Sequence, residues 1–243
     1  MILAVAIQKG GTGKTTTAAA LANAARYRGR KVLAIDLDPQ GQFSFTIGAD
    51  TSKPGSYELL TGAPAADLIQ PIKENLSVIP ASPNLATITS GRGSARRLQT
   101  AIAPVRERYD VIVLDTPTLG ELQYNALQAA TKLVIPLEAA IYDLQSLYQI
   151  VDTARQFQTS NPELSIAGIV LTKYDGRSTI VRQMKDAIVN RAAEIGVPYL
   201  GAIRAAVAVK EAAALQESLF EYAPKSKPAA DYLAIYDAIA QEG

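Results

Sequence analysis

Short apolar runs alternate along this chain with longer segments in which apolar residues recur at helical spacing. The short runs are continuous rather than interrupted by polar residues, a pattern typical of strands that are buried on both faces of a sheet. Helical segments between successive strands predict an α/β fold with a doubly wound, mostly parallel sheet and right-handed crossovers. The predicted strands cover residues 1–7, 32–38, 76–81, 110–115, 133–138, 166–173 and 199–204.

The clearest helical segments cover residues 15–28, 144–159, 180–195 and 229–241. Gly29 is the expected stop of the first, because glycine readily adopts the left-handed conformation that ends a helix. The least regular region, residues 40–73, contains several glycines and prolines and predicts loops and short helices. Neither a repeat nor a low-complexity linker divides the sequence, so we expect one domain over residues 1–243.

The amino-acid composition limits the chemistry that the chain can perform more than it limits the fold. With 48% hydrophobic and 19% charged residues, the chain can bury a substantial core and is too apolar for a disordered chain. The absence of cysteine and histidine argues against disulfides, iron–sulfur clusters, thiol nucleophiles and zinc sites. Carboxylates, hydroxyls, lysines and a hard cation such as Mg²⁺ remain. Because no apolar run reaches the length of a membrane span and no signal peptide is recognisable, we expect a cytoplasmic protein.

The first predicted strand leads directly into the sequence QKGGTGKTT at residues 8–16, which opens a helix. Glycines allow backbone N–H groups to point at phosphate oxygens, and the helix N-terminus adds its dipole. Gln8 stands where the strict phosphate-loop pattern has its first glycine, so an incidental glycine-rich turn is the alternative. The order of strand, loop and helix favours the phosphate loop. The predicted nucleotide-binding residues are Lys9, Gly10, Gly11, Thr12, Gly13, Lys14, Thr15 and Thr16.

Two further strands end in aspartates. Asp36 and Asp38 lie at the end of the second strand, and Asp115 ends the strand at residues 110–115. In a doubly wound sheet, ligands bind at the carboxyl ends of strands, beside the loop that follows the first strand. Asp36 and Asp38 could instead be turn-forming aspartates ahead of Pro39. The neighbouring phosphate loop favours a functional role for both aspartates, with Thr15 and Asp115 in the positions expected of Mg²⁺-binding residues.

The loop resembles the deviant Walker A motif of the ParA/MinD family, K-G-G-x-G-K-S/T, in which Lys9 is the signature lysine. The resemblance implies that Lys9 reaches across an ATP-dependent homodimer to the partner's nucleotide. The segment DLDPQG at residues 36–41 resembles the first switch of ParA proteins. The resemblance implies that Asp38 orients the attacking water, and it completes a predicted Mg²⁺ site of Thr15, Asp36, Asp38 and Asp115. Asp115 matches the Walker B aspartate ahead of a second switch, although Thr118 replaces the usual second proline.

The resemblance extends over nearly the whole chain and is strongest to short ParA/Soj-like partition ATPases that lack an N-terminal helix-turn-helix. One departure lies in the segment expected near the adenine of the nucleotide. The family often carries Ile-Pro-Arg-Asn there, and this chain has Ile203, Arg204, Ala205 and Ala206. MinD proteins end in a basic membrane-binding helix, whereas residues 233–243 contain no basic residue. We therefore interpret the last helix as a core helix and expect no membrane partner.

Basic residues gather in one part of the sequence. Residues 173–210 contain seven basic and three acidic residues, while the whole chain has a net charge of +1. Because ParA-like dimers bind DNA non-specifically, this segment is a candidate DNA surface, and solvated helix faces are the alternative. A second cluster comprises Arg92, Arg96 and Arg97. The DNA candidates are Arg177, Arg182, Lys185, Arg204 and Lys210.

Together these features predict a ParA-like ATPase that hydrolyses ATP to ADP and phosphate slowly, with Lys9, Lys14 and Asp38 as catalytic residues. The resemblance implies ATP, ADP and Mg²⁺ as cofactors, nucleoid DNA as a partner, and a ParB-like or cargo-adaptor protein that stimulates hydrolysis. Plasmid or chromosome DNA is the expected cargo, and a carboxysome or a chemoreceptor array is an alternative. A metabolic P-loop enzyme similar to dethiobiotin synthetase is a further alternative.

Overall fold

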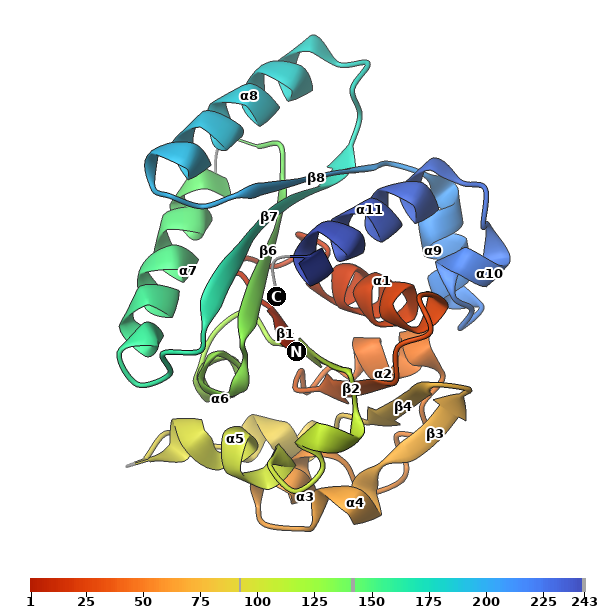
Figure 1. Ribbon diagram of the computed structural model, residues 1–243, viewed down its shortest axis with the longest axis vertical. Helices are drawn as coiled ribbons and strands as arrows, with labels where there is room; N and C mark the ends of the chain where they lie inside the picture. The colour runs from red at the N-terminus through yellow and green to blue at the C-terminus, as the bar shows by residue number, and fades with distance from the viewer. Residues whose placement is uncertain (92, 141–142, 242–243) are drawn as a thin grey trace.

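The computed structural model describes residues 1–91, 93–140 and 143–241. Within them one eight-stranded sheet has the order β3-β4-β2-β5-β1-β6-β7-β8, and every neighbouring pair is parallel except β3 with β4. Figure 1 shows the sheet between two layers of helices, which confirms the predicted doubly wound α/β fold. The strands are β1 Ile2–Val5, β2 Val32–Asp36, β3 Gln70–Lys73, β4 Leu76–Ile79, β5 Val111–Asp115, β6 Lys132–Glu138, β7 Ser165–Tyr174 and β8 Tyr199–Arg204.

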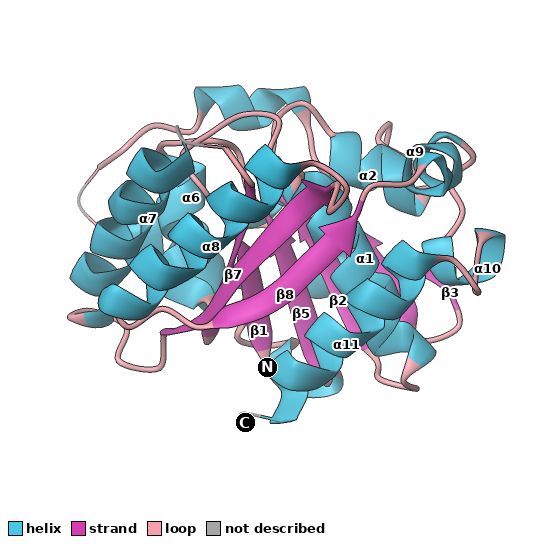
Figure 2. Cartoon of the chain, turned by 90° about the horizontal axis from the view of Figure 1, so that it is seen from above, coloured by secondary structure: helices cyan, strands magenta, loops and turns pink. Residues whose placement is uncertain are grey.

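Helices cover both faces of the sheet (Figures 1 and 2). One layer contains α1 and α11, which pack against alternate residues of β1 such as Leu3 and Val5. The other contains α5, α6 and α7, which pack with Ala4 of the same strand. The helices are α1 Lys14–Tyr27, α2 Gln42–Ile47, α3 Ser56–Leu60, α4 Ala65–Leu68, α5 Arg97–Ile102, α6 Glu121–Ala129, α7 Asp143–Gln158, α8 Thr179–Glu194, α9 Val207–Ala214, α10 Leu219–Tyr222 and α11 Lys227–Gln241.

Strand register aligns the residues that the sequence singles out. Asp36 at the end of β2 pairs with Asp115 at the end of β5, and Asp115 also pairs with Val5 at the end of β1. The loop that follows β1 therefore begins beside both aspartates. Because all three strands are parallel, their carboxyl ends meet at one edge of the sheet, where doubly wound folds bind ligands.

The structure differs from the predicted elements in two respects. Strand β3 was not predicted, because its short segment with Pro71 lies in the irregular region 40–73. It forms an antiparallel edge, a position that tolerates proline. Strands β1 and β2 are also shorter than the apolar runs that predicted them. Ile7 and Leu37 lie beyond the strands and stay fully buried, so hydrophobicity alone overestimates the strand length.

The last helix is a core helix, as predicted. Tyr232, Ile235 and Ile239 of α11 are buried in the same cluster as α1. Among the described residues, no helix is both long enough and apolar enough to cross a membrane.

Candidate nucleotide-binding site

The loop between β1 and α1 has the backbone that a phosphate site requires. Gly11 and Gly13 have φ angles of 78° and 86°, in the left-handed region that glycine adopts without strain. Helix α1 begins at Lys14, directly after Gly13, and the N–H of Thr17 donates to the Gly13 carbonyl at 2.8 Å. The loop therefore delivers the N–H groups and the dipole of a long helix to the edge of the sheet, an arrangement that binds anions.

Lys14 spans this loop from inside. Its Nζ donates to the Lys9 carbonyl at 2.9 Å, and the side chain is largely buried. Burial lowers the pKa of Lys14, while the negative charges of Asp115 and Asp38 act in the opposite direction. A cation enclosed by the loop and facing carboxylates is well placed to contact the phosphates of a bound nucleotide.

Asp115 has the features of a metal-supporting carboxylate. Its Oδ2 accepts a hydrogen bond from the Thr15 hydroxyl at 2.8 Å, whereas its fully buried Oδ1 has no partner within the described part of the chain. Burial, and next the nearby charge of Asp36, raise the pKa of Asp115 well above its usual value. A buried oxygen without a donor, beside a threonine hydroxyl, fits the hydrated shell of Mg²⁺.

The described residues contain no group of three or more acidic side chains that could hold a metal by themselves. Thr15 and Asp115 offer the one or two protein ligands that Mg²⁺ usually takes together with phosphate oxygens and water. The residues present therefore fit a Mg²⁺ that arrives with a nucleotide.

Asp36 is bound differently. Its Oδ1 accepts from the Asp38 N–H at 3.0 Å, and its Oδ2 accepts from the N–H and the hydroxyl of Ser44 at 2.8 and 2.7 Å. The Ser44 Oγ in turn accepts from the Ala81 N–H at 2.8 Å. Burial raises the pKa of Asp36 to about 6, against the effect of these hydrogen bonds. Asp36 thus ties residues 38–44 to the core, while its predicted metal contact stays a prediction.

Asp38 stands on the segment that Asp36 anchors. Its Oδ1 accepts from the Gln40 N–H at 3.0 Å, which closes a local turn over Pro39 and fixes the Asp38 side chain. The following residues Gln40 and Gly41 face Thr15 across a hollow of about 550 Å³. The predicted first switch therefore lies beside the start of α1, where the phosphates of a nucleotide would lie.

Lys9 points away from the inside of the loop. Its Nζ forms an ion pair with Asp143, a fully buried residue at the start of α7. The other oxygen of Asp143 accepts from the Glu138 N–H at 2.7 Å, so the carboxylate is held on both sides. The two lysines of the loop therefore have separate environments: Lys14 bridges the loop, and Lys9 is bound to α7 of its own chain.

Two residues at the end of β7 hold the loop from outside. The Thr172 hydroxyl donates to the Thr12 carbonyl at 2.8 Å, and the Lys173 ammonium donates to the Gly11 carbonyl at 2.6 Å. Lys173 also forms an ion pair with Glu138 at 2.6 Å. In the sequence, Lys173 is one member of the basic segment at residues 173–210, and its contact with the loop was not predicted. The available signal was that β7 ends at the same edge of the sheet as the loop.

An apolar cleft of about 410 Å³ opens beside Gly13 and Thr16. Its walls come from the end of β8, the start of α9 and Tyr232 of α11. This volume lies within the usual range for small-molecule sites, roughly 300–1,000 Å³. Because the cleft continues from the phosphate loop, it suits the base and ribose of a nucleotide. Its lining from β8 to α9 consists of Ile203, Arg204, Ala205, Ala206, Val207, Val209 and Lys210.

Comparison with known proteins agrees with this geometry. A family model described as an AAA domain matches residues 1–166. The chromosome-partitioning ATPase Soj of Thermus thermophilus is 35% identical over 233 residues, covering 95% of this chain and 91% of the relative. The sporulation initiation inhibitor protein Soj of Bacillus subtilis is 34% identical over 254 residues, covering 100% and 99%. The chain belongs to the ParA/MinD family of P-loop ATPases.

A solved structure supports the same assignment for the fold. The cobyrinic acid a,c-diamide synthase of Mycobacterium smegmatis, with an ATP analogue and magnesium, has a TM-score of 0.85 and 30% identity, covering 99% of this chain and 94% of the other. By its match to the two Soj proteins, this ParA/MinD-family protein is an ATPase of the partition type, and the family predicted from the loop at residues 8–16 is confirmed.

The candidate DNA residues of this ParA/MinD-family protein fall in two places. Arg177 is paired with Asp175, Arg182 donates to the Gly176 carbonyl at 2.7 Å, and Lys185 lies 3.7 Å from Asp186, all around the start of α8. Arg204 and Lys210 instead line the base cleft, where Arg204 is paired with Asp231. Register also pairs Arg204 of β8 with Tyr174, three residues before Arg177, and the role of these basic residues in DNA binding stays a prediction. Arg92 of the second cluster lies outside the described residues.

Proposed function

We propose that this protein is an ATP-dependent switch that forms a sandwich homodimer, binds DNA non-specifically and positions plasmid or chromosome DNA. The observation that carries the proposal is the separation of the two loop lysines. Lys14 bonds to its own loop, whereas Lys9 is bound at the loop surface by Asp143, its one ion-pair partner among the described residues. A half-exposed lysine held in this way is available to a second nucleotide. The 243 residues act as one P-loop unit.

Hydrolysis in this proposal depends on positioning and charge. The N–H groups of the loop and Lys14 bind the β- and γ-phosphates of ATP, and Thr15 and Asp115 hold Mg²⁺. Bound Mg²⁺ neutralises charge on the phosphate oxygens. Asp38 orients the attacking water, and Asp36 fixes Asp38 through its backbone N–H. ADP and phosphate are the products.

Dimerisation in this proposal requires Lys9 to change partners. In the isolated chain its charge is neutralised by Asp143. On binding the nucleotide of the facing subunit, Lys9 exchanges this carboxylate for phosphate oxygens, which carry more negative charge. Formation of the dimer is thereby coupled to the presence of ATP.

DNA binding and the partner protein complete the cycle. We place the DNA contacts on Arg177, Arg182 and Lys185 around the start of α8, which are at the protein surface. Arg204 and Lys210 contribute only where the base cleft leaves them accessible. The dimer binds nucleoid DNA in the cytoplasm, and a ParB-like or cargo-adaptor protein stimulates hydrolysis and releases it.

The decisive experiment measures DNA binding by the purified protein with ATP, with ADP and without nucleotide, at two salt concentrations. Salt-sensitive binding that requires ATP and disappears in Lys9→Ala is the expected result. Lys225→Ala removes an exposed lysine away from the loop and serves as the matched control. If ATP gives no more binding than ADP, or if Lys9→Ala binds normally, the proposed switch is wrong.

The likeness to a cobyrinic acid a,c-diamide synthase favours one second candidate, an enzyme that activates a small carboxylic acid for amide formation. This candidate predicts that ATP turnover rises when an acceptor acid and ammonia are supplied, with no effect of DNA. The two functions separate in one assay of phosphate release, carried out with DNA or with such an acceptor. The near-complete match to two Soj proteins favours the switch.

A further inference from the structure

A groove of about 660 Å³ lies on a part of the molecule that the nucleotide site does not use. It runs between the segment from α3 to α4 on one side and α5 with the following residues on the other. Small apolar side chains form its floor, among them Ala63, Ala65 and Ala101, with Val105 buried beneath. The helices that border it lie together at the lower end of the molecule in Figure 1.

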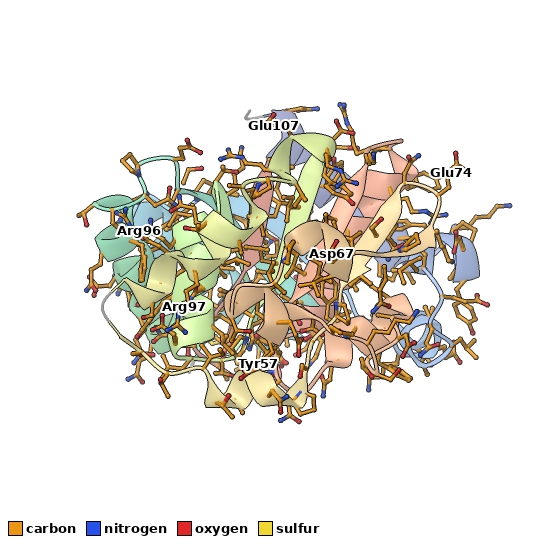
Figure 3. The ribbon with its side chains drawn as sticks, turned by 90° about the horizontal axis from the view of Figure 1, so that it is seen from below. Tyr57, Asp67, Glu74, Arg96, Arg97 and Glu107 are labelled. Atoms are coloured by element: carbon orange, nitrogen blue, oxygen red, sulfur yellow. The ribbon has the colours of Figure 1, made fainter. Side chains whose placement is uncertain are left out.

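Three arginines border this groove. Arg96 and Arg97 stand at the start of α5, and Arg108 follows its end. In the described part of the chain, none of their guanidinium groups has an ion pair or a hydrogen bond, whereas the neighbouring Arg106 is paired with Glu163. Figure 3 shows Arg96 and Arg97 on the left of this face, Asp67 near its middle and Glu74 toward its right edge. The edge at α5 therefore carries guanidinium groups without a carboxylate partner among the described residues.

We propose that this groove docks an acidic amphipathic segment of a partner protein. Apolar side chains of the segment would fill the floor, and its carboxylates would pair with Arg96, Arg97 and Arg108. Arginine forms bidentate pairs with carboxylates and is common in protein interfaces. A nucleic acid would satisfy the arginines alone and leave the apolar floor uncovered. Charge and shape together therefore favour a peptide over DNA.

The groove is also connected to the second switch. The Leu98 N–H of α5 donates to the Asn125 Oδ1 of α6 at 3.0 Å. The Nδ2 of Asn125 in turn donates to the carbonyl of Glu121 at the start of α6. Helix α6 begins six residues after Asp115. A segment docked on α5 is therefore placed to affect the residues that follow Asp115. This consequence rests on the proposed function, while docking itself does not.

The test uses a fluorescein-labelled peptide of two Leu-Glu-Glu-Ala-Leu-Glu-Glu repeats, a matched peptide with Lys in place of Glu, and a DNA duplex. Binding to the full chain is followed by fluorescence anisotropy at low and high salt. The charge variant is Arg96→Glu with Arg97→Glu, and Ala66→Trp fills the groove without changing its charge. The control, Arg177→Glu with Arg182→Glu, changes equal charge at α8.

Salt-sensitive binding of the acidic peptide is expected, weakened roughly tenfold or more by the charge variant and also by Ala66→Trp. The lysine peptide should not bind, and the α8 control should bind the acidic peptide as the wild type does. Peptide binding should reduce hydrogen exchange in residues 59–66 and 96–108.

The proposal is overturned if the acidic peptide does not bind or if the charge variant binds it unchanged. If the charge variant loses DNA binding while the peptide never binds, the arginines form a nucleic-acid surface instead. If the wild type shows no ATP-dependent DNA binding but binds the acidic peptide, the proposed function is wrong and peptide docking stands. Failure of the function and failure of the docking are therefore distinguishable.

Discussion

Strands β2 and β5 end in Asp36 and Asp115, which pair in register and are both fully buried. The two carboxylates nevertheless have different surroundings. Asp36 accepts three hydrogen bonds from residues 38–44 of its own chain. Asp115 accepts one from Thr15 and keeps a buried oxygen without a partner among the described residues.

This difference distinguishes a structural carboxylate from one that is ready for a ligand. Burying a carboxylate is costly, and hydrogen bonds normally offset much of that cost. At Asp36 the fold supplies the donors, so the charge stabilises the position of the first switch. At Asp115 the fold leaves an acceptor unused at the edge where a nucleotide and Mg²⁺ would bind. We therefore expect the same residue type at equivalent strand ends to serve two purposes, a structural one at Asp36 and support of Mg²⁺ at Asp115.

The largest effect should come from Asp115→Asn. Without the charge that supports Mg²⁺, ATP hydrolysis should fall by roughly 100-fold or more. The free energy of unfolding should change little, because a buried charge is removed while the new NH₂ group finds no acceptor among the described residues. Phosphate release at saturating Mg²⁺ and chemical denaturation of the apoprotein measure the two effects.

Asp110→Asn, an exposed position just before β5, is the matched control and should leave hydrolysis unchanged. If Asp115→Asn hydrolyses ATP normally, the assignment of its unpaired oxygen to Mg²⁺ is wrong. If the variant is instead strongly destabilised, Asp115 is a structural residue in the same sense as Asp36.

For Asp36→Asn we expect a loss of stability rather than a loss of hydrolysis. An amide can accept through only one atom, so its NH₂ group would face the Ser44 donors or the Asp38 N–H. Leaving a buried donor unsatisfied costs about 1–3 kcal/mol, and the free energy of unfolding should fall by that amount. Urea denaturation monitors this change, and Asp50→Asn in an exposed turn with Ser52 should have little effect.

The comparison between the aspartates would fail if Asp36→Asn had wild-type stability but lost Mg²⁺-dependent nucleotide binding. That result would restore Asp36 to the metal site, as the sequence pattern predicts. A variant that is less stable but still binds nucleotide with Mg²⁺ supports its structural role.

The sequence predicted those parts of the molecule that depend on local pattern. The strands in the buried layer, the phosphate loop and the positions of Asp36, Asp38 and Asp115 follow from apolar runs and short motifs. Strand β3 escaped prediction because four partly exposed residues with a proline give no strand signal. Its place in the sheet comes from pairing with β4, a tertiary interaction.

The partners of the site residues were not predictable for the same reason. Asp143 lies 134 residues from Lys9, and Thr172 lies 160 residues from Thr12. Such pairs are created when distant strands end at one edge, and no local spacing reports them. Even the bond from Ser44 to Asp36, only eight residues apart, was not predictable from the sequence. It depends on the short helix α2, which places Ser44 beside Asp36.

Asp143 is a third buried carboxylate, and it differs from Asp36 and Asp115 because it forms an ion pair with Lys9. In Asp143→Asn the side chain keeps its shape and can still accept from the Glu138 N–H, but the charge that neutralises Lys9 is lost. Because Lys9 is partly exposed, solvent weakens the ion pair, and its removal is worth at most about 1 kcal/mol. We therefore expect dimerisation at an ATP concentration up to about fivefold lower, measured by analytical ultracentrifugation.

Asp152→Asn, an exposed position on the same helix, should dimerise like the wild type. A higher ATP requirement in Asp143→Asn would mean that Asp143 supports the dimer rather than restraining Lys9 in the single chain.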